Sequence, residues 1–247
     1  MLGVGLSTAC MCVCCGGEMT PYSTWVSQCR GCGFMASTLA SGGGTGVDGL
    51  EELRRGNYER ILTRLERLHP MAGARVLDVG SARGWFIEAA LARGAAAQGV
   101  EPEHANAELC RERGLQVESG FFPQDLADRG PFELVTFNDV FEHLPEPAAA
   151  AVAAEALLRP GGLLVLNVPS SRGALFRLSA VLARLGLPGP YERLWQKEFA
   201  SPHVSYFARR SLAALIGRHT DLTLVDSFSL PSVSRNGLVA RVSGSHG

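Results

Sequence analysis

The stretch that decides the fold is VLDVGSARGWF, residues 76–86. A short apolar run ends at Asp78, and Gly80 and Gly84 follow it at a spacing of four before another apolar segment. Glycines let the backbone approach a ligand closely, and the free N–H groups of a helix N-terminus attract nucleotide-like groups. The stretch therefore predicts a strand, a glycine turn and a helix that together hold a nucleotide-like ligand.

Strand-like and helix-like segments alternate outward from this turn. Strands are expected at 74–80, 96–101, 115–120, 132–138 and 163–169, with helices at 83–93, 103–113 and 147–159 and a sharp turn at 160–162. A helix at 48–70 precedes the series, and a helix at 209–219 with strands at 222–230 and 237–243 ends it. This alternation predicts an α/β, doubly wound, Rossmann-like fold with a parallel sheet.

Length and charge limit the function classes. The chain has 247 residues and a net charge of −1, with acidic and basic residues interspersed, which suits one large α/β domain and a small appendage. A nucleic-acid partner is not expected because Lys and Arg are not clustered, and a membrane span is not expected because no apolar run reaches about 18 residues. The first residues lack the basic start of a secretory signal, so a cytoplasmic location is expected.

Two details of the turn favour S-adenosylmethionine over NAD. The spacing is G-S-A-R-G, whereas the dinucleotide fingerprint is G-x-G-x-x-G. The acid at Asp78 would repel a pyrophosphate, but it suits the ammonium and sulfonium end of S-adenosylmethionine. Glu101 ends the next strand, where a carboxylate can accept hydrogen bonds from the ribose hydroxyls of either ligand.

Four blocks in order, VLDVGSARGWF, GVEP, FELVTFNDVFEHLPEP and LLRPGGLLVLNVPS, resemble a class I S-adenosylmethionine-dependent methyltransferase. The resemblance runs from residue 74 to about 243 and implies a seven-stranded sheet. It also implies a set of cofactor-binding residues: Asp78, Gly80, Ser81, Gly84, Glu101, Pro102, Phe121 and Asn138. Ala82 replaces a glycine often found in this turn, and whether Asp125 lies by the adenine is left open.

The segment NDVFEHLPEP allows three interpretations. It is similar to quinone-pathway O-methyltransferases, in which two acids and a histidine can bind a Mg²⁺-like ion, so Asp139, Glu142 and His143 are a candidate divalent-metal site. In the interpretation that we favour, Glu142 and His143 orient the loop by hydrogen bonds. In the third, His143 is a general base, with His203 of SPHVSYF as its rival.

The segment at about 171–207 is expected to be a lid or acceptor insertion. Its aromatic residues offer walls for an acceptor, and its apolar helix at 174–187 carries Arg177 and Arg184. That helix could exclude water as a lid, lie on a lipid surface, or simply pack against the domain.

Four cysteines form two matching C-x-x-C-G knuckles: Cys12, Cys15, Cys29 and Cys32. Four thiolates at this spacing predict a tetrahedral structural Zn²⁺ site, similar to a zinc ribbon. Cys10 and Cys14 lie beside the first knuckle and are alternative ligands. Residues 1–38 are therefore expected to be a zinc-ribbon-like module and residues 39–47 a linker. Residues 48–247 would then form the methyltransferase domain. The module could hold an acceptor, a partner or a homodimer.

The expected function is transfer of a methyl group from S-adenosylmethionine, by SN2 displacement, to an oxygen, nitrogen or carbon atom. The acceptor would be a small molecule such as a sugar, a quinone-like compound, a lipid or a secondary metabolite. Catalysis would consist mainly of alignment because the donor is already activated. The alternatives are a non-catalytic module that senses the cofactor and binds a partner, and an rRNA methyltransferase.

Overall fold

The computed structural model describes residues 10–40, 50–127, 130–230 and 235–242. The expected linker at 39–47 lies outside the described residues from position 41 onward.

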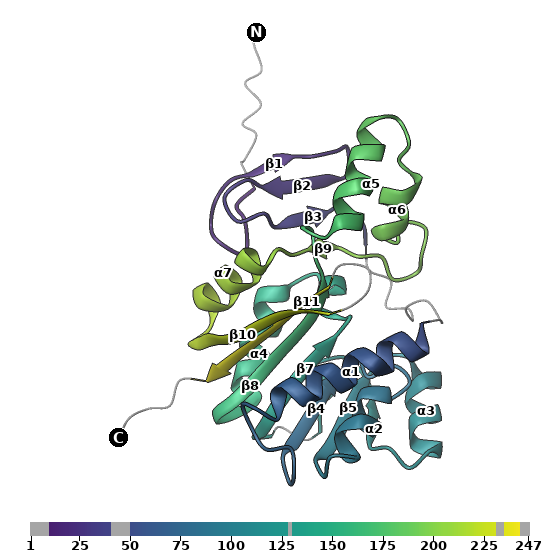
Figure 1. The fold of residues 1–247 in the computed structure, drawn as a ribbon, viewed down its shortest axis with the longest axis vertical. Coiled ribbons are helices and arrows are strands. Elements are labelled where there is room, and N and C mark those ends of the chain that lie inside the picture. The colour runs from purple at the N-terminus through teal and green to yellow at the C-terminus, as the bar shows by residue number, and fades with distance from the viewer. Residues whose placement is uncertain (1–9, 41–49, 128–129, 231–234, 243–247) are drawn as a thin grey trace.

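A seven-stranded sheet is the centre of the fold (Figure 1). Its strands, in spatial order, are β10 (Leu222–Leu230), β11 (Arg235–Val242), β8 (Leu158–Pro169), β7 (Phe132–Asn138), β4 (Arg75–Val79), β5 (Ala96–Glu101) and β6 (Val117–Ser119). Strands β8, β7, β4, β5 and β6 pair in parallel, whereas β11 is antiparallel to both of its neighbours. The expected α/β, Rossmann-like, seven-stranded fold is confirmed.

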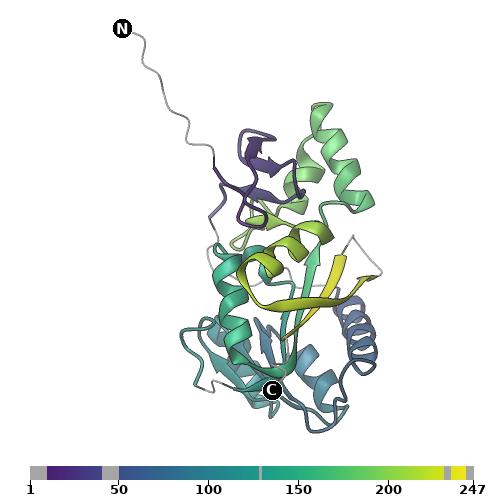
Figure 2. The same cartoon turned by 90° about the vertical axis from the view of Figure 1, so that its left-hand side faces the viewer.

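Helices cover both faces of this sheet. On one face lie α1 (Glu51–Leu65), α2 (Trp85–Leu91) and α3 (His104–Glu112), whose apolar side chains share a core with Val76, Leu134 and Val165. On the other face lie α4 (Pro147–Leu157) and α7 (Arg209–His219), which pack on Leu77 and Phe137. Figure 2 shows α1 and α4 on opposite sides of the sheet. The alternating apolar positions of the central strands therefore face two separate cores.

The Pro-Gly-Gly segment after α4 is part of a strand, not the sharp turn that the sequence suggests. Strand β8 begins at Leu158, directly after α4, and its register with β7 shifts between Phe132 and Leu134. A Cβ atom at Gly162 would lie 3.0 Å from the Arg159 carbonyl oxygen. The glycines therefore accommodate an irregularity at the start of the strand.

A second, antiparallel sheet joins distant parts of the chain. It contains β1 (Met19–Pro21), β2 (Val26–Cys29), β3 (Met35–Ser37) and β9 (Ser205–Tyr206), in that order. Met35 pairs with Tyr206, and Ala36 pairs with Ser205. The N-terminal module, which we define from here on as residues 10–38, thus shares its sheet with the segment that the sequence assigns to the acceptor insertion.

That insertion forms two helices beside the module (Figure 1), namely α5 (Ala174–Arg184) and α6 (Gly189–Leu194). The sequence did not suggest α6. Phe176, Tyr191 and Trp195 are buried and contact one another. Phe176 and Trp195 also contact Tyr206. Trp25 of the module packs edge-on against Trp195 at 5.5 Å between ring centroids. Aromatic contacts therefore fasten the insertion to the module.

The outer face of α5 is apolar and exposed at Leu175, Leu178 and Val181. No helix among the described residues is long and apolar enough to cross a membrane.

The first prediction concerns Gly84, which has φ +73° at the start of α2. A Cβ atom there would lie 2.5 Å from Leu115 Cδ1 and 3.0 Å from Cys110 Sγ. Gly84→Ala should therefore lower the free energy of unfolding by about 2 to 4 kcal/mol, through backbone strain and overpacking together. Urea denaturation measures this change.

Gly73 is the matched control, because it has φ +74° and no atom lies within 4 Å of the position that a Cβ atom would take there. Gly73→Ala should cost only the backbone part, about 1 to 2 kcal/mol. Equal decreases in the free energy of unfolding for Gly84→Ala and Gly73→Ala would contradict the packing role of Gly84.

Candidate active site

Asp78 lies at the carboxyl end of β4 and is buried. Its Oδ1 accepts hydrogen bonds from Thr136 Oγ1 at 2.8 Å and from Asn138 Nδ2 at 3.0 Å, both on the neighbouring β7. Burial raises the pKa of Asp78 to about 7, although these two hydrogen bonds lower it. Sequence reasoning missed Thr136, whose only signal is a polar residue inside the apolar run FELVTFN.

Glu101 lies at the carboxyl end of β5 and is also buried. Its Oε2 accepts a hydrogen bond from the Ala82 N–H at 2.7 Å, and its Oε1 accepts one from the Glu103 N–H at 2.9 Å. Burial raises the pKa of this carboxyl group as well. Each carboxylate oxygen has a second lone pair, so Glu101 can hold the glycine turn and still accept from a ligand.

The glycine turn has left-handed backbone at three positions, Gly80, Ala82 and Gly84. A side chain at Gly80 would collide with Val140, so only glycine lets the turn lie against the loop that follows β7. Ala82 adopts φ +45°, which explains why glycine is favoured at this position.

A cavity of about 1400 Å³ opens at these strand ends. Seven of the eight expected cofactor-binding residues line it: Asp78, Gly80, Ser81, Glu101, Pro102, Phe121 and Asn138. Gly84 does not line it and instead packs against Leu115 and Cys110. Asp125 is also outside the wall, where its carboxylate accepts a hydrogen bond from the Phe121 N–H at 2.8 Å.

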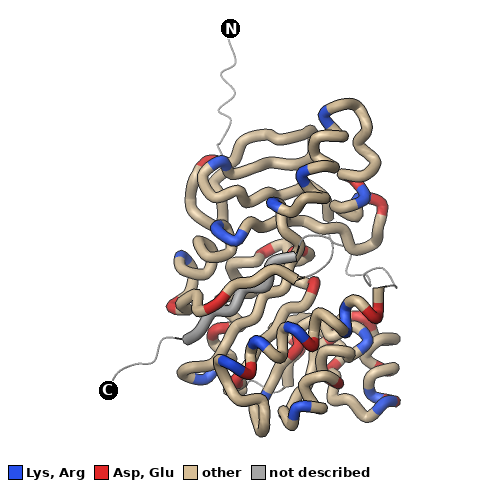
Figure 3. Tube along the Cα trace, in the orientation of Figure 1, with Lys and Arg blue, Asp and Glu red and all other residues tan. Residues whose placement is uncertain are grey.

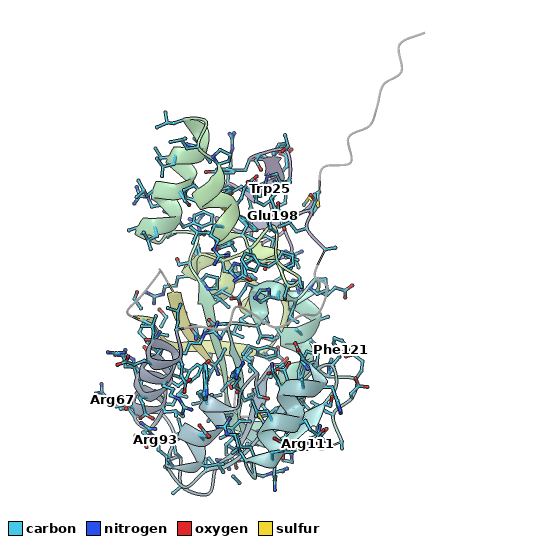
Figure 4. The ribbon with its side chains drawn as sticks, turned by 90° about the vertical axis from the view of Figure 1, so that its right-hand side faces the viewer. Trp25, Arg67, Arg93, Arg111, Phe121 and Glu198 are labelled. Atoms are coloured by element: carbon cyan, nitrogen blue, oxygen red, sulfur yellow. The ribbon has the colours of Figure 1, made fainter. Side chains whose placement is uncertain are left out.

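The cavity extends beyond the strand ends to the module. Phe121 is 59% exposed, and Figure 4 shows it at the edge of the α/β domain, with Trp25 in the module above it. Helix α1 contributes Arg54 and Tyr58 to the wall, and the module contributes Met11 and Phe34. Sequence reasoning named none of these four residues. At about 1400 Å³ the cavity exceeds the 300–1,000 Å³ of a typical single-ligand site, so it has room for a nucleotide-like ligand and a second molecule.

His143 and His203 lie together in this wall. Their rings are 4.7 Å apart between centroids, and both residues border the cavity with Glu142. Glu142 and His143 lie in a 3-10 turn (Phe141–His143) after β7, and His203 lies just before β9. Burial lowers the pKa of His143, although its hydrogen bond to the Pro202 carbonyl and the nearby Asp139 raise it. The neutral imidazole is therefore favoured near neutral pH.

The hydrogen bonds fix the tautomer of each neutral histidine. His143 Nδ1 lies 2.9 Å from the Pro202 carbonyl oxygen, which can only accept, so this nitrogen donates. Tyr206 donates its hydroxyl proton to the Leu194 carbonyl at 2.7 Å, so its oxygen accepts from His203 Nδ1 at 3.1 Å. Each histidine is consequently left with a lone pair on Nε2.

Glu142, His143 and His203 could together hold a cation, since their ligand atoms lie within 4.8 Å of one another. His203 thus takes the place that the sequence analysis gave to Asp139. Asp139 has a left-handed backbone, φ 60°, and its Oδ2 lies 3.9 Å from Arg54 Nε. Among the described residues, Asp139 is not part of this close group.

The four module cysteines converge at a second place. The sulfur atoms of Cys12, Cys15, Cys29 and Cys32 all lie within 4.8 Å of one another. Cys12 and Cys32 are 3.5 Å apart, as are Cys15 and Cys29. Ligands about 2.3 Å from a tetrahedral Zn²⁺ are separated by similar distances, so the set fits this ion.

The two knuckles have the same backbone. The Gly16 N–H donates to the Cys12 carbonyl at 2.8 Å, and the Gly33 N–H donates to the Cys29 carbonyl at 2.8 Å. Both glycines have positive φ, +74° and +81°. Glycine after the second cysteine of each pair therefore allows the tight turn that brings the sulfur atoms together.

Comparison with known proteins identifies the family. Residues 50–227 match the family model described as a methyltransferase domain. The chain belongs to the methyltransferase domain family. The resemblance to class I S-adenosylmethionine-dependent methyltransferases is thereby confirmed.

Two curated relatives have similar sequences. The ubiquinone biosynthesis O-methyltransferase of Xanthomonas euvesicatoria is 34% identical over 164 residues, which are 62% of this chain and 66% of the relative. That of Xylella fastidiosa is 31% identical over 168 residues, 64% of each chain. The chain thus spans slightly less than two thirds of the length of these relatives.

Solved structures share the fold of the methyltransferase domain. Magnesium protoporphyrin IX methyltransferase from Synechocystis, with bound SAH, superposes with a TM-score of 0.60 at 14% identity, over 81% of this chain and 90% of that one. A complex of the Haloferax volcanii Trm112 methyltransferase activator with a methyltransferase gives 0.61 at 14% identity, over 80% and 94%. At this identity the likeness concerns the fold alone.

The second prediction follows from the buried Asp78 carboxyl group. Its pKa is 3.8 as a free group and about 7 in the fold, so the folded chain binds the proton more tightly than the unfolded chain. The free energy of unfolding should therefore fall as pH rises between these two values. The Asp78→Asn variant has no carboxyl group at this position and so lacks this pH dependence. As pH rises, its free energy of unfolding should therefore increase relative to that of wild type, by at most about 1.4 kcal/mol per pH unit.

Urea unfolding without added ligand, repeated across that pH range, measures this difference. Asp125→Asn, which alters an exposed carboxylate, is the control and should follow the wild-type profile. Parallel profiles for wild type and Asp78→Asn would show that the Asp78 pKa is not raised.

Proposed function

We propose that this chain is an S-adenosylmethionine-dependent methyltransferase that acts on a hydroxyl group of a small acceptor, with an aromatic acceptor as the first candidate. The observation that carries the proposal is one cavity lined by two chemically different groups of residues. Asp78, Glu101 and Asn138 form what we call its acidic end, and His143 and His203 form what we call its histidine end.

The residues at the acidic end fit S-adenosylmethionine. Glu101 retains acceptor capacity for ribose hydroxyls, and Asn138 Oδ1 has no hydrogen-bond partner among the described residues. The acids suit a cationic ligand. S-adenosylmethionine supplies the methyl group in a single SN2 displacement, and the chain's own residues bind and orient the acceptor and remove its proton.

His143 is the proposed base. Its Nδ1–H is held by the Pro202 carbonyl, so its Nε2 can accept a proton from an acceptor hydroxyl in the cavity. The Nε2 atom of His203 lies 3.9 Å from Glu142 Oε1, beside a carboxylate group, and we assign the base role to His143 rather than to His203. Oxygen is favoured as the methylated atom because the relatives are named O-methyltransferases.

A structural zinc ion is proposed at Cys12, Cys15, Cys29 and Cys32. Four thiolates close the coordination sphere, so the ion would hold the module together and leave no position for a reacting group. The mixed distribution of acidic and basic residues along the chain (Figure 3) gives less support to the rRNA alternative than to a small acceptor.

The third prediction tests the cofactor. Isothermal titration calorimetry should show micromolar S-adenosylmethionine binding to wild type, and Glu101→Ala should weaken it by about 10- to 100-fold because two ribose hydrogen bonds are lost. Glu103→Ala is the control, because it keeps the Glu101 carboxylate. Binding of NAD in preference to S-adenosylmethionine would refute the proposal, and binding without turnover of any acceptor would favour the non-catalytic sensor.

The fourth prediction tests the base. With catechol as the first acceptor in a panel of phenols, His143→Ala should lower kcat by about 100-fold or more and leave S-adenosylmethionine affinity unchanged. Burial lowers the pKa of His143 from 6.5, so the rate should fall only at pH values below 6.5. His203→Ala should have the smaller effect on kcat.

A divalent cation at Glu142, His143 and His203 would give a different result. It would occupy Nε2 of both histidines, so added Mg²⁺ or Mn²⁺ would stimulate turnover, and the two variants would lose activity equally. Such stimulation would contradict the role of His143 as the base and would favour a metal-dependent reaction.

A further inference from the structure

The module supplies part of the cavity wall. Seven apolar residues of this wall come from the module or from the segment just beyond it: Met11, Val13, Met19, Phe34, Ala36, Leu39 and Ala40. Among the described residues of the module, none that lines the cavity carries a charge. This wall is therefore suited to an apolar group.

Part of this wall is available to a ligand. Met11 borders the cavity and is 64% exposed, and Val13 is half-buried. Methionine is flexible and polarizable, so its side chain can adapt to ligands of different shape. The apolar surface at Met11 and Val13 is thus accessible from the cavity.

The same module also holds the histidine end in place. The Ser37 N–H donates to the Val204 carbonyl at 2.9 Å, and Ser37 Oγ donates to the His203 carbonyl at 3.2 Å. On the other side, the His203 N–H donates to the Trp195 carbonyl at 3.0 Å. The backbone of His203 is consequently fixed between the module and the insertion.

We propose that the module is the acceptor-recognition element of this chain, with Met11 and Val13 forming the surface that receives an apolar substituent of the acceptor. The inference rests on the proposed function and deepens it, since it assigns the acceptor to hydroxylated molecules that carry an apolar chain. The module is smaller than the roughly 40 residues below which a folded unit usually needs a metal or disulfides, so this recognition depends on the four-cysteine site being metal-loaded.

The test uses the full-length, zinc-loaded chain and catechols that carry a straight alkyl chain of one to six carbons para to one hydroxyl. Their affinities are measured by calorimetry with S-adenosylhomocysteine present. Affinity should rise up to about fourfold for each added methylene group, because each one is buried against the wall. Met11→Ser with Val13→Ser should flatten this dependence.

Leu178→Ser is the matched control. Leu178 is 56% exposed on α5 and does not line the cavity, so its loss should leave the chain-length dependence unchanged. Zinc content is measured for each variant, because a loaded module excludes simple unfolding. The inference is overturned if wild type shows no chain-length dependence, or if the double variant keeps it.

Removal of the metal provides an independent readout. Chelation should abolish binding of the alkylcatechols but change the affinity for S-adenosylhomocysteine by less than about threefold. Trp195 is fully buried against Trp25, so undocking of the module should shift tryptophan emission to the red. Alkylcatechol binding that survives metal loss together with this shift would overturn the inference.

Failure of the proposed methyl transfer can be distinguished from failure of acceptor recognition by the module. Turnover of phenols without chain-length dependence would overturn the inference and leave the proposed function intact. Chain-length-dependent binding without any turnover would support the module as a recognition element and count against methyl transfer.

Discussion

The buried carboxyl group of Asp78 is the constraint on which the site depends. A carboxyl group in such a place must be given hydrogen-bond donors, and Thr136 and Asn138 supply them from the adjacent strand. These bonds tie the end of β4 to the end of β7. The glycine turn that follows β4 then lies beside Glu101, whose carboxylate accepts a hydrogen bond from the Ala82 N–H. The acidic end of the cavity is thus built from the ends of three neighbouring strands.

The histidine end of the cavity has another origin. It is assembled from the turn after β7, the segment before β9 and the N-terminal module, which are distant in sequence. The β3–β9 pairing and the aromatic contacts of Trp195 hold these pieces together. The carboxyl ends of neighbouring strands thereby provide the acidic end, whereas segments that are distant in sequence provide the histidine end.

Local patterns were enough to predict most of the methyltransferase domain. All seven strands of the main sheet follow from apolar runs punctuated by turns, and the acid–glycine turn places seven of eight expected residues at the cavity. Gly84 does not line the cavity, and a glycine required for helix packing looks the same in sequence as one that faces a ligand. The start of β8 was missed because Pro-Gly-Gly is as typical of a turn as of a strand irregularity.

Long-range features could not be predicted in this way. Strand β9 has only two residues, so it has no periodicity, and nothing local shows that it pairs with the module. The replacement of Asp139 by His203 beside Glu142 likewise depends on a left-handed backbone at Asp139 and on the fold of a distant segment.

The pairing of β3 with β9 also has a consequence for biosynthesis. Ser37 and His203 are 166 residues apart, so the module leaves the ribosome long before its fourth strand exists. Its cysteines are close in sequence and can meet early, whereas the strand edge at β3 stays open until β9 is made. Closure of so long a loop is a late and slow event in folding. A nascent chain therefore completes its central sheet and its histidine end in the same final stage of synthesis.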